Sequence, residues 1–348
     1  MLPQLPNSCL SEILRLLNPN IQAAAILVSR RFARIARAEL YRAVKVEGDR
    51  TQRFFSALQN KQELGALVKE LTLAGNEYEG DNDDGLHAAF SSLVNLRSLH
   101  IHYMRLGFTH LLKNIPGQLE DLLYWPTMCD DAIDFLLSQP HITSAFFGDL
   151  NLAALDLPLF LPHLTDITAP PEDLVIIVPS RPVKHVEFHY FDGDQVRQPI
   201  ISLQFLSSSS APILSLELQV SQLVAAAAEV PELRVLLPDI RRLVIYQDKS
   251  WGSALIAADD FNDSIDSVVT IVDQLSTIRH LVIACTYSVS QARLIRHKFI
   301  VNSQLDLDVL VIGTMDSILY WTDMLPSSEH ICLPLEPAAA RYIRNLRY

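Results

Sequence analysis

The sequence predicts an α/β protein in which a short helical N-terminal segment is followed by an irregular solenoid of parallel strands. Two observations support this fold class. Apolar residues recur at helical spacing near the start, and from about residue 50 onward a short apolar-x-x-Leu-x-Leu segment returns with helical patterns between its copies. At 348 residues, the chain can hold one small and one large domain.

The first predicted helix follows from Leu10, Ile13, Leu14 and Leu17, whose spacing places four aliphatic side chains on one helical face. Ser8 precedes this run, and its hydroxyl is expected to cap the first turn by accepting a backbone N–H. The helix should end at Asn18-Pro19-Asn20, because a residue that precedes proline is disfavoured in the helical conformation.

A second helix is predicted over roughly residues 21–40. One face of it carries Ala24, Val28, Phe32 and Ile35, and the other carries Arg30, Arg34 and Arg37. Two or three amphipathic helices in under fifty residues barely bury a core alone. They therefore either cover the next domain or dock on a partner, and helical periodicity does not decide between the two.

The order of residues is more informative than their periodicity. Leu5-Pro6, the leucine/isoleucine helix up to Leu17, and then Val28-Ser29-Arg30-Arg31-Phe32 resemble the F-box family. The stretch from Ala38 to Val44 resembles the exit of fungal F-box proteins, where a Leu-Tyr pair leads into a first strand. The chain departs from the family pattern at Ser8, where Glu is usual, at Ser29, where Cys is common, and in the turn, which lacks an acidic residue.

The resemblance implies binding to a Skp-type adaptor of a cullin–RING ubiquitin ligase. The apolar contact or support set that it implies consists of Leu5, Pro6, Leu10, Ile13, Leu14, Leu17, Val28 and Phe32. A helix pair that offers aliphatic anchors to a groove is a common recognition mode. The departures leave open a second hypothesis, a ligase-independent repeat scaffold whose F-box is degenerate.

The body of the chain carries the repeated segment. Copies fall at residues 68–73, 96–101, 119–122, 164–167, 183–188, 213–218, 240–245, 278–283 and 307–312. Helical patterns lie between them, at residues 52–67, 85–93, 130–137, 222–230 and 261–275. One strand and one helix per unit resembles the leucine-rich-repeat layout, and the first copy extends to Asn76, where that family places an asparagine. The predicted domains are therefore residues 2–46, a helical docking module, and residues 50–348, a repeat solenoid.

Alternation along each strand predicts which side chains face the open side of this solenoid. The wider outward set is Glu70, Thr72, Ser98, His100, Asp121, Leu123, His185, Glu187, Ser215, Glu217, Arg242, Val244, His280 and Val282. Because such a face commonly binds partners, a protein substrate is expected to contact Ser98, His100, Asp121, His185, Glu187, Glu217, Arg242 and His280.

The distribution of charge along the chain argues against one class of partner, nucleic acid. The net charge is −12, and because residues 1–48 carry +4, the remainder carries −16. An acidic body argues against nucleic acid as a partner, since phosphate contacts need clustered Lys and Arg. No run of eighteen apolar residues occurs, so no membrane span is expected, and the first residues do not resemble a secretory signal.

No motif predicts catalysis, a cofactor or a metal. The sequence has no Gly-x-Ser-x-Gly elbow, phosphate-binding Gly-Lys loop or His-Glu-x-x-His helix, so we expect no enzyme. A doubly wound nucleotide-binding sheet is disfavoured because an acidic loop, residues 79–84, follows the first strand copy. His100 and His102, like His185 and His189, would need a third ligand to hold zinc, so we expect no metal.

The cysteines indicate a compartment. Cys9, Cys129, Cys285 and Cys332 are widely spaced and form no Cys-x-x-Cys pair, which favours buried free thiols in a reducing compartment. We therefore expect the cytosol or the nucleus. The function that best fits the sequence is substrate recruitment to an SCF-type ligase.

Overall fold

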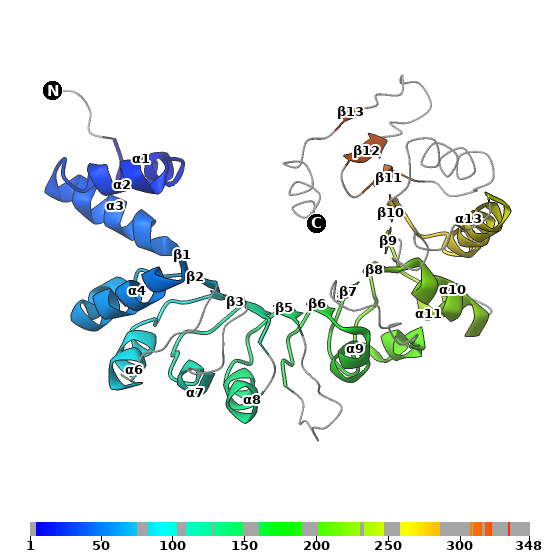
Figure 1. Cartoon of the computed structure of the whole chain (residues 1–348), viewed down its shortest axis with the longest axis horizontal. Coiled ribbons are helices and arrows are strands. Elements are labelled where there is room, and N and C mark those ends of the chain that lie inside the picture. Colours follow the sequence, from blue (N-terminus) through cyan, green and yellow to red (C-terminus); the bar gives the residue numbers. More distant parts are fainter. Residues whose placement is uncertain are drawn as a thin grey trace. The chain divides into compact units, whose positions relative to one another are not determined.

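The structure is a computed structural model of the whole chain. It describes residues 5–74, 83–102, 109–126, 129–148, 160–189, 201–229, 233–246, 258–285, 307, 309–314, 317–321 and 333–334. The chain forms two compact units, Met1–Leu164 and Thr165–Tyr348. Figure 1 shows the order of their elements.

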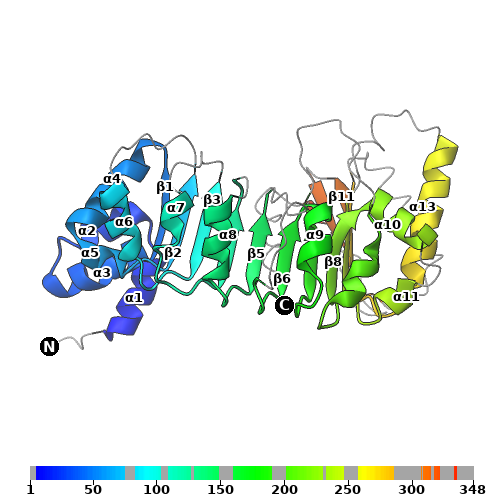
Figure 2. The ribbon, with the colours of Figure 1, turned by 90° about the horizontal axis from the view of Figure 1, so that it is seen from below.

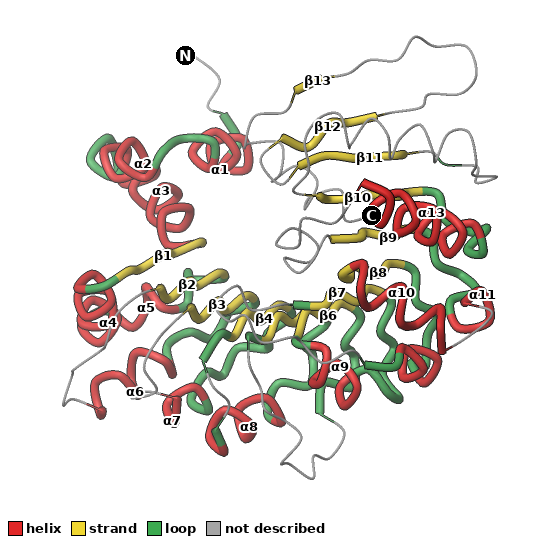
Figure 3. Tube along the Cα trace, turned by 45° about the vertical axis from the view of Figure 1, so that its right-hand side comes forward, coloured by secondary structure: helices red, strands yellow, loops and turns green. Residues whose placement is uncertain are grey.

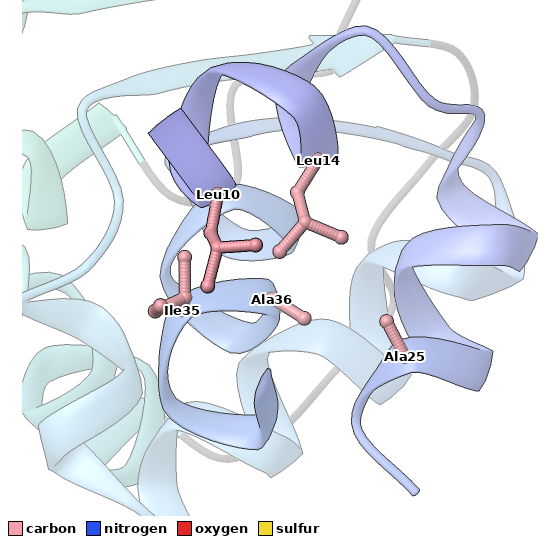
Figure 4. Packing of buried hydrophobic residues seen from close by; sticks show 5 residues of the cluster. All are labelled: Leu10, Leu14, Ala25, Ile35 and Ala36. Atoms are coloured by element: carbon pink, nitrogen blue, oxygen red, sulfur yellow. The ribbon is translucent and has the colours of Figure 1, made fainter. Parts of the chain in front are cut away.

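The first unit begins with three helices, α1 (Asn7–Arg15), α2 (Pro19–Ala25) and α3 (Arg30–Arg42), which we call the helical module. Its core consists of Leu10, Leu14, Ala25, Ile35 and Ala36 (Figure 4), with Leu17, Ile26 and Phe32 packed against it. Leu10 and Leu14 are one helical turn apart, which brings both side chains onto α3. The core is small, and each of its buried side chains therefore matters to the fold of the module.

The helix ends follow local capping chemistry. The Asn18 side chain accepts the Ile21 N–H at 3.0 Å, and Pro19 occupies the first turn of α2. The predicted single helix over residues 21–40 is wrong, because the chain breaks after α2. Ser29 is extended there, and its hydroxyl accepts the Phe32 N–H at 3.2 Å to start α3. Ser8 does not cap: it lies inside α1, which follows Pro6.

A buried glutamine joins the first two helices. Gln22 on α2 donates its side-chain amide to the carbonyl oxygens of Leu14 at 2.9 Å and Leu17 at 3.1 Å. Both carbonyls lie where α1 ends, and the Leu14 carbonyl also accepts the Leu17 N–H at 3.0 Å. The buried amide joins the end of α1 to α2, a role that hydrophobic periodicity does not reveal.

A parallel sheet follows the helical module in the first unit. Its strands pair in chain order: β1 (Ala43–Glu47), β2 (Glu70–Ala74), β3 (Ser98–His102), β4 (Asp121–Tyr124) and β5 (Ser144–Phe147). The helices between them are α4 (Asp49–Asn60), α5 (Gln62–Gly65), α6 (Asp83–Ser91), α7 (Thr109–Leu112) and α8 (Asp130–Leu137). Helices α4, α6, α7 and α8 lie on one side of the strands (Figure 3), where alternate strand residues such as Leu71 and Leu73 are buried.

The second unit repeats this arrangement. Strands β6 (Asp166–Ala169), β7 (His185–Phe188), β8 (Ser215–Gln219), β9 (Arg242–Tyr246), β10 (His280–Cys285) and β11 (Val309–Thr314) are parallel. Strands β12 (Ser317–Trp321) and β13 (Leu333–Pro334) continue the sheet antiparallel. Between the strands lie α9 (Pro171–Ile177), the 3-10 helix η2 (Leu203–Ser208), α10 (Val220–Glu229), α11 (Leu233–Leu236) and α13 (Ala258–Asp273), and Figure 2 shows α9 and α10 over the strands.

One backbone contact recurs at the start of successive strands. The carbonyl oxygen of Lys69, the residue before β2, accepts the N–H groups of both Arg97 and Ser98 at 2.8 and 3.0 Å. The Arg97 carbonyl does the same for the start of β4, and the Lys184 carbonyl does so for β8. The residues with these carbonyls therefore occupy the same position relative to their strands, and they lie next to one another across the sheet.

The predicted fold class, a helical start followed by parallel strands in an α/β arrangement, is confirmed. Each of the nine predicted strand segments overlaps an observed strand, namely β2–β4 and β6–β11. Strand β5 was not predicted, because Ala145 stands where the predicted copies carry a larger aliphatic residue, most often leucine. The domain division at residues 2–46 and 50–348 stays a prediction, and Asn76 lies outside the described residues.

Candidate functional site

The predicted adaptor-binding residues divide into two groups. Leu10 and Leu14 are buried in the module core, and Leu17 and Phe32 pack partly buried against it. The others point to solvent: Leu5 (52% exposed), Ile13 (47%), Val28 (67%) and Pro6, which is also exposed. The first group supports the module, and the second group is exposed and can contact a partner.

The structure adds three exposed aliphatic residues that the periodicity did not single out. Leu16 is 82% exposed, Leu27 is 87% exposed and Ile21 is 47% exposed. Six of the eleven exposed large hydrophobic side chains in the described part of the chain fall within residues 5–28: Leu5, Ile13, Leu16, Ile21, Leu27 and Val28. Leu16 follows the end of α1 and Leu27 follows the end of α2, so neither belongs to the apolar face that helical spacing predicts. Their position beside a turn was the sequence feature that could have predicted their exposure.

Polar contacts hold the start of the chain on α3. The Arg31 guanidinium donates to the Asn7 side-chain oxygen at 2.8 Å and to the Leu5 carbonyl oxygen. The Ser11 hydroxyl donates to the Glu39 carboxylate, which joins α1 to α3. Arg31 therefore holds the backbone at Leu5 in place, while the Leu5 side chain remains exposed.

The strand face of the first unit holds a compact polar cluster. The His100 Nε2 atom lies 2.8 Å from an Asp121 carboxylate oxygen, and the Ser98 hydroxyl donates to the same oxygen at 2.8 Å. Burial raises the pKa of Asp121, but hydrogen bonds from His100 and Ser98 outweigh it, and that pKa lies below its usual value. Burial, with His100 and Lys45 nearby, lowers the pKa of His102.

This cluster does not have the geometry of a nucleophilic triad. The Ser98 hydroxyl lies 3.1 Å from His100 Nε2, the same ring nitrogen that contacts Asp121. In a Ser-His-Asp triad, the hydroxyl and the carboxylate contact opposite ring nitrogens, so that the imidazole can take the hydroxyl proton while the carboxylate orients the ring. The arrangement instead orients three polar groups on the sheet surface.

A second polar cluster lies on the strand face of the second unit. Glu217 accepts from the Arg242 guanidinium and from the Tyr246 hydroxyl, the latter at 2.7 Å. Burial and the charges of Glu217 and Glu187 raise the pKa of Tyr246. The Thr168 hydroxyl donates to Glu187 at 3.1 Å, on the strand next to Glu217. Tyr246 is therefore a neutral hydrogen-bond donor to a carboxylate.

The residues of the predicted outward face differ in exposure. The eight predicted substrate-binding residues are half-buried strand residues: Ser98, His100, Asp121, His185, Glu187, Glu217, Arg242 and His280. From the wider set, Ser215, Val244 and Val282 are buried. The Arg242 guanidinium reaches the Ser215 hydroxyl at 3.2 Å, and Val244 and Val282 are cross-strand neighbours.

Other sequence expectations have mixed outcomes. Cys9 is exposed rather than buried, because Leu10 and Leu14 take the buried side of α1, while Cys129 is half-buried and free. Among the residues that the structure describes, no three His, Cys, Asp or Glu side chains group as metal ligands. No helix within these residues has the length and apolar character needed to cross a bilayer.

Comparison with known families identifies the helical module. Residues 2–41 match the family model of the F-box domain. The chain carries an F-box domain. The matched range spans α1, α2 and nearly all of α3. F-box domains bind Skp-type adaptors in SCF complexes, and F-box proteins are generally adaptors rather than enzymes.

The other comparisons add no family. No curated protein matches the sequence. A solved structure of a protein from Bacteroides fragilis is similar at 11% identity and a TM-score of 0.35, covering 77% of this chain and 74% of that chain.

Proposed function

We propose that this protein is a substrate receptor of an SCF-type cullin–RING ubiquitin ligase. In this role the F-box docks a Skp-type adaptor, and the strand face binds a target protein. The receptor performs no chemistry itself; it brings the target close to the conjugating enzyme and so raises the effective concentration. The F-box match at residues 2–41 is the observation that carries the proposal.

The surface of the F-box supports docking. Its exposed aliphatic side chains lie outside the buried core of the module. Exposed apolar residues that gather in one part of a protein usually mark an interaction site. Leu16 and Leu27 are the most exposed of them and are the best positions at which to test docking.

The strand face supports recognition of a target. Side chains on this face come from consecutive parallel strands in register, for example Thr72, His100 and Leu123. Strand-to-strand hydrogen bonds fix their relative positions, so the face is a preformed array of polar and apolar groups. Such a surface binds without ordering a loop, which lowers the entropic cost of association.

The test is co-purification of the full chain with a Skp-type adaptor. We expect the wild-type protein to retain the adaptor and the Leu16→Glu/Leu27→Glu variant to lose at least tenfold in affinity, because charge would replace apolar contacts. Calorimetry or surface plasmon resonance would give the affinities. The buried Leu10 and Leu14 are unsuitable for this purpose, since acidic residues there would unfold the module.

Val235→Glu is the matched control, because Val235 is 71% exposed and lies in the second unit. This variant should bind the adaptor like the wild type. If wild-type protein does not bind the adaptor, the docking proposal is wrong. The ligase-independent scaffold, which the departures at Ser8 and Ser29 motivate, then becomes the better account.

A further inference from the structure

A row of mostly cationic residues lies along the N-terminal ends of four neighbouring strands in the second unit. The residues immediately before β7, β8, β9 and β10 are Lys184, Leu214, Arg241 and Arg279, and we call them the edge row. Lys184, Arg241 and Arg279 are exposed, and Leu214 is half-buried. This local positive charge stands out in a chain whose net charge is −12.

Backbone hydrogen bonds align the edge row. The Lys184 carbonyl accepts the Leu214 N–H at 2.7 Å, the Leu214 carbonyl accepts the Arg241 N–H at 2.8 Å, and the Arg241 carbonyl accepts the Arg279 N–H at 2.8 Å. Neighbouring members therefore lie about 4.8 Å apart, the spacing of strands in a sheet. The row spans about 14 Å from Lys184 to Arg279.

The neighbouring residues leave the row positive. The first residues of the four strands are His185, Ser215, Arg242 and His280, of which Arg242 is already paired with Glu217. The described acidic side chains closest in sequence and register are Asp166, beside His185, and Asp239, two residues before Arg241. Arg279 also interacts within the chain, but a guanidinium has five N–H donors and can serve more than one partner.

The first unit supplies a comparison. The equivalent positions there are Arg42, Lys69, Arg97, Glu120 and Thr143, by the same pattern of carbonyl bonds. Arg97 and Glu120 form an ion pair at 2.6 Å, which neutralises one cation of this row and leaves Arg42 and Lys69. The edge row of the second unit has cations on three of its four strands and no acid among them.

We propose that the edge row binds an extended acidic segment of the target protein; this inference rests on the proposed function. Alternate side chains of an extended peptide lie about 6.7 Å apart on one face, so residues i and i+4 span about 13 Å. Carboxylates at such positions match the length of the row. Arginine pairs with carboxylates through two parallel N–H bonds, which favours Arg241 and Arg279 as the main anchors.

The cations lie along a line, and this arrangement favours an extended acidic segment over a single phosphorylated residue as the ligand. A single phosphate needs several cations that converge on one point, whereas the edge row has its three cations spread along a line of four strands. Several carboxylates along a segment satisfy separated cations one at a time. Because the cations are exposed, binding must weaken as salt increases.

The experiment measures fluorescence anisotropy of labelled peptides with the full-length protein. The probes are an eight-residue peptide that alternates Glu and Ser, the same peptide with Lys in place of Glu, and a Gly/Ser peptide with one phosphoserine. We expect the Glu peptide to bind, the Lys peptide not to bind, and the phosphoserine peptide to bind at least fivefold more weakly. Raising salt from 50 to 300 mM should reduce the affinity for the Glu peptide several-fold.

The variant Arg241→Gln/Arg279→Gln should reduce affinity for the Glu peptide at least tenfold. Arg97→Gln, at the equivalent position of the first unit, is the matched control and should bind like the wild type. Lys184→Gln is a second, milder variant that should lose affinity to a smaller degree. Thermal melts would verify that each variant is folded; because all these side chains are exposed, we expect unchanged melting.

Three outcomes would overturn the inference: equal binding of the Glu and Lys peptides, retained affinity in the folded Arg241/Arg279 variant, or tighter binding of the phosphoserine peptide. Adaptor co-purification is measured on the same proteins. If adaptor binding persists while the Glu peptide does not bind, the acidic-segment inference fails and the ligase role stands. Loss of adaptor binding by the wild type, with the Glu peptide still bound, would remove the ligase role instead.

Discussion

At the scale of single residues, His102 is expected to make the stability of the protein depend on pH. Burial lowers its pKa from the ordinary value of 6.5, and the positive charges of His100 and Lys45 add to the effect. The unfolded chain therefore binds more protons at this residue, and its contribution to stability is lost as pH falls from 6.5 through the folded pKa. We expect the free energy of unfolding in urea to decrease from pH 7.5 to pH 5.5, and His102→Asn to reduce that decrease.

Two residues refine this pH prediction. Half-buried His189 also has a pKa that burial lowers, and it acts in the same direction, so the variant should remove only part of the slope. The lowered pKa of Asp121 acts below its ordinary value of 3.8, outside the measured range. Exposed His141→Asn is the control. An unchanged slope in the His102 variant would show that its burial does not control the response.

At the scale of an element, helix α3 depends on a cap that fixes where it begins. Ser29 accepts the Phe32 N–H, and the helix that follows supplies Ile35 and Ala36 to the core of the F-box. We expect Ser29→Ala to destabilise the protein by about 1 kcal/mol, the usual cost of removing a serine cap. Hydrogen exchange of α3 amides would locate the effect.

Ser8→Ala provides the contrast at the same scale. Ser8 was predicted to cap α1, but it lies inside the helix and is exposed, so alanine should be neutral or slightly stabilising there. Urea unfolding of both variants measures the difference. Equal losses from the two substitutions would mean that the Ser29 bond contributes nothing to the helix.

At the scale of the whole molecule, the two proposed functions lie in separate compact units. The F-box belongs to Met1–Leu164 and the edge row to Thr165–Tyr348. Substitutions at distant sites with no shared partners usually add within about 0.5 kcal/mol. We therefore expect the combined Leu16→Glu/Leu27→Glu and Arg241→Gln/Arg279→Gln variant to lose adaptor and Glu-peptide binding, each as in its parent.

The measurement is a double-mutant cycle on both affinities. A coupling near zero supports recognition and docking as independent tasks of one chain. A Glu-peptide affinity that changes when only the F-box is altered would require a connection between the units.

Secondary structure followed from the sequence where side-chain periodicity alone specifies it. Helix α8 has the predicted bounds, residues 130–137, and the leucine segments all became strands. Prediction failed where a polar side chain or a weak apolar residue decided the outcome. Ser29 split one predicted helix into two, and β5 pairs through Ala145 and Phe147 without leucine.

The sequence by itself determined the F-box pattern and the order of helices and strands, because both depend on residue types at fixed spacing. Only the tertiary structure decided that Leu10 and Leu14 support the module while Leu16 and Leu27 face solvent. Likewise, only the strand register placed Arg241 beside Arg279, thirty-eight positions away in the chain. Exposure and cross-strand proximity depend on contacts between distant segments, which local spacing does not encode.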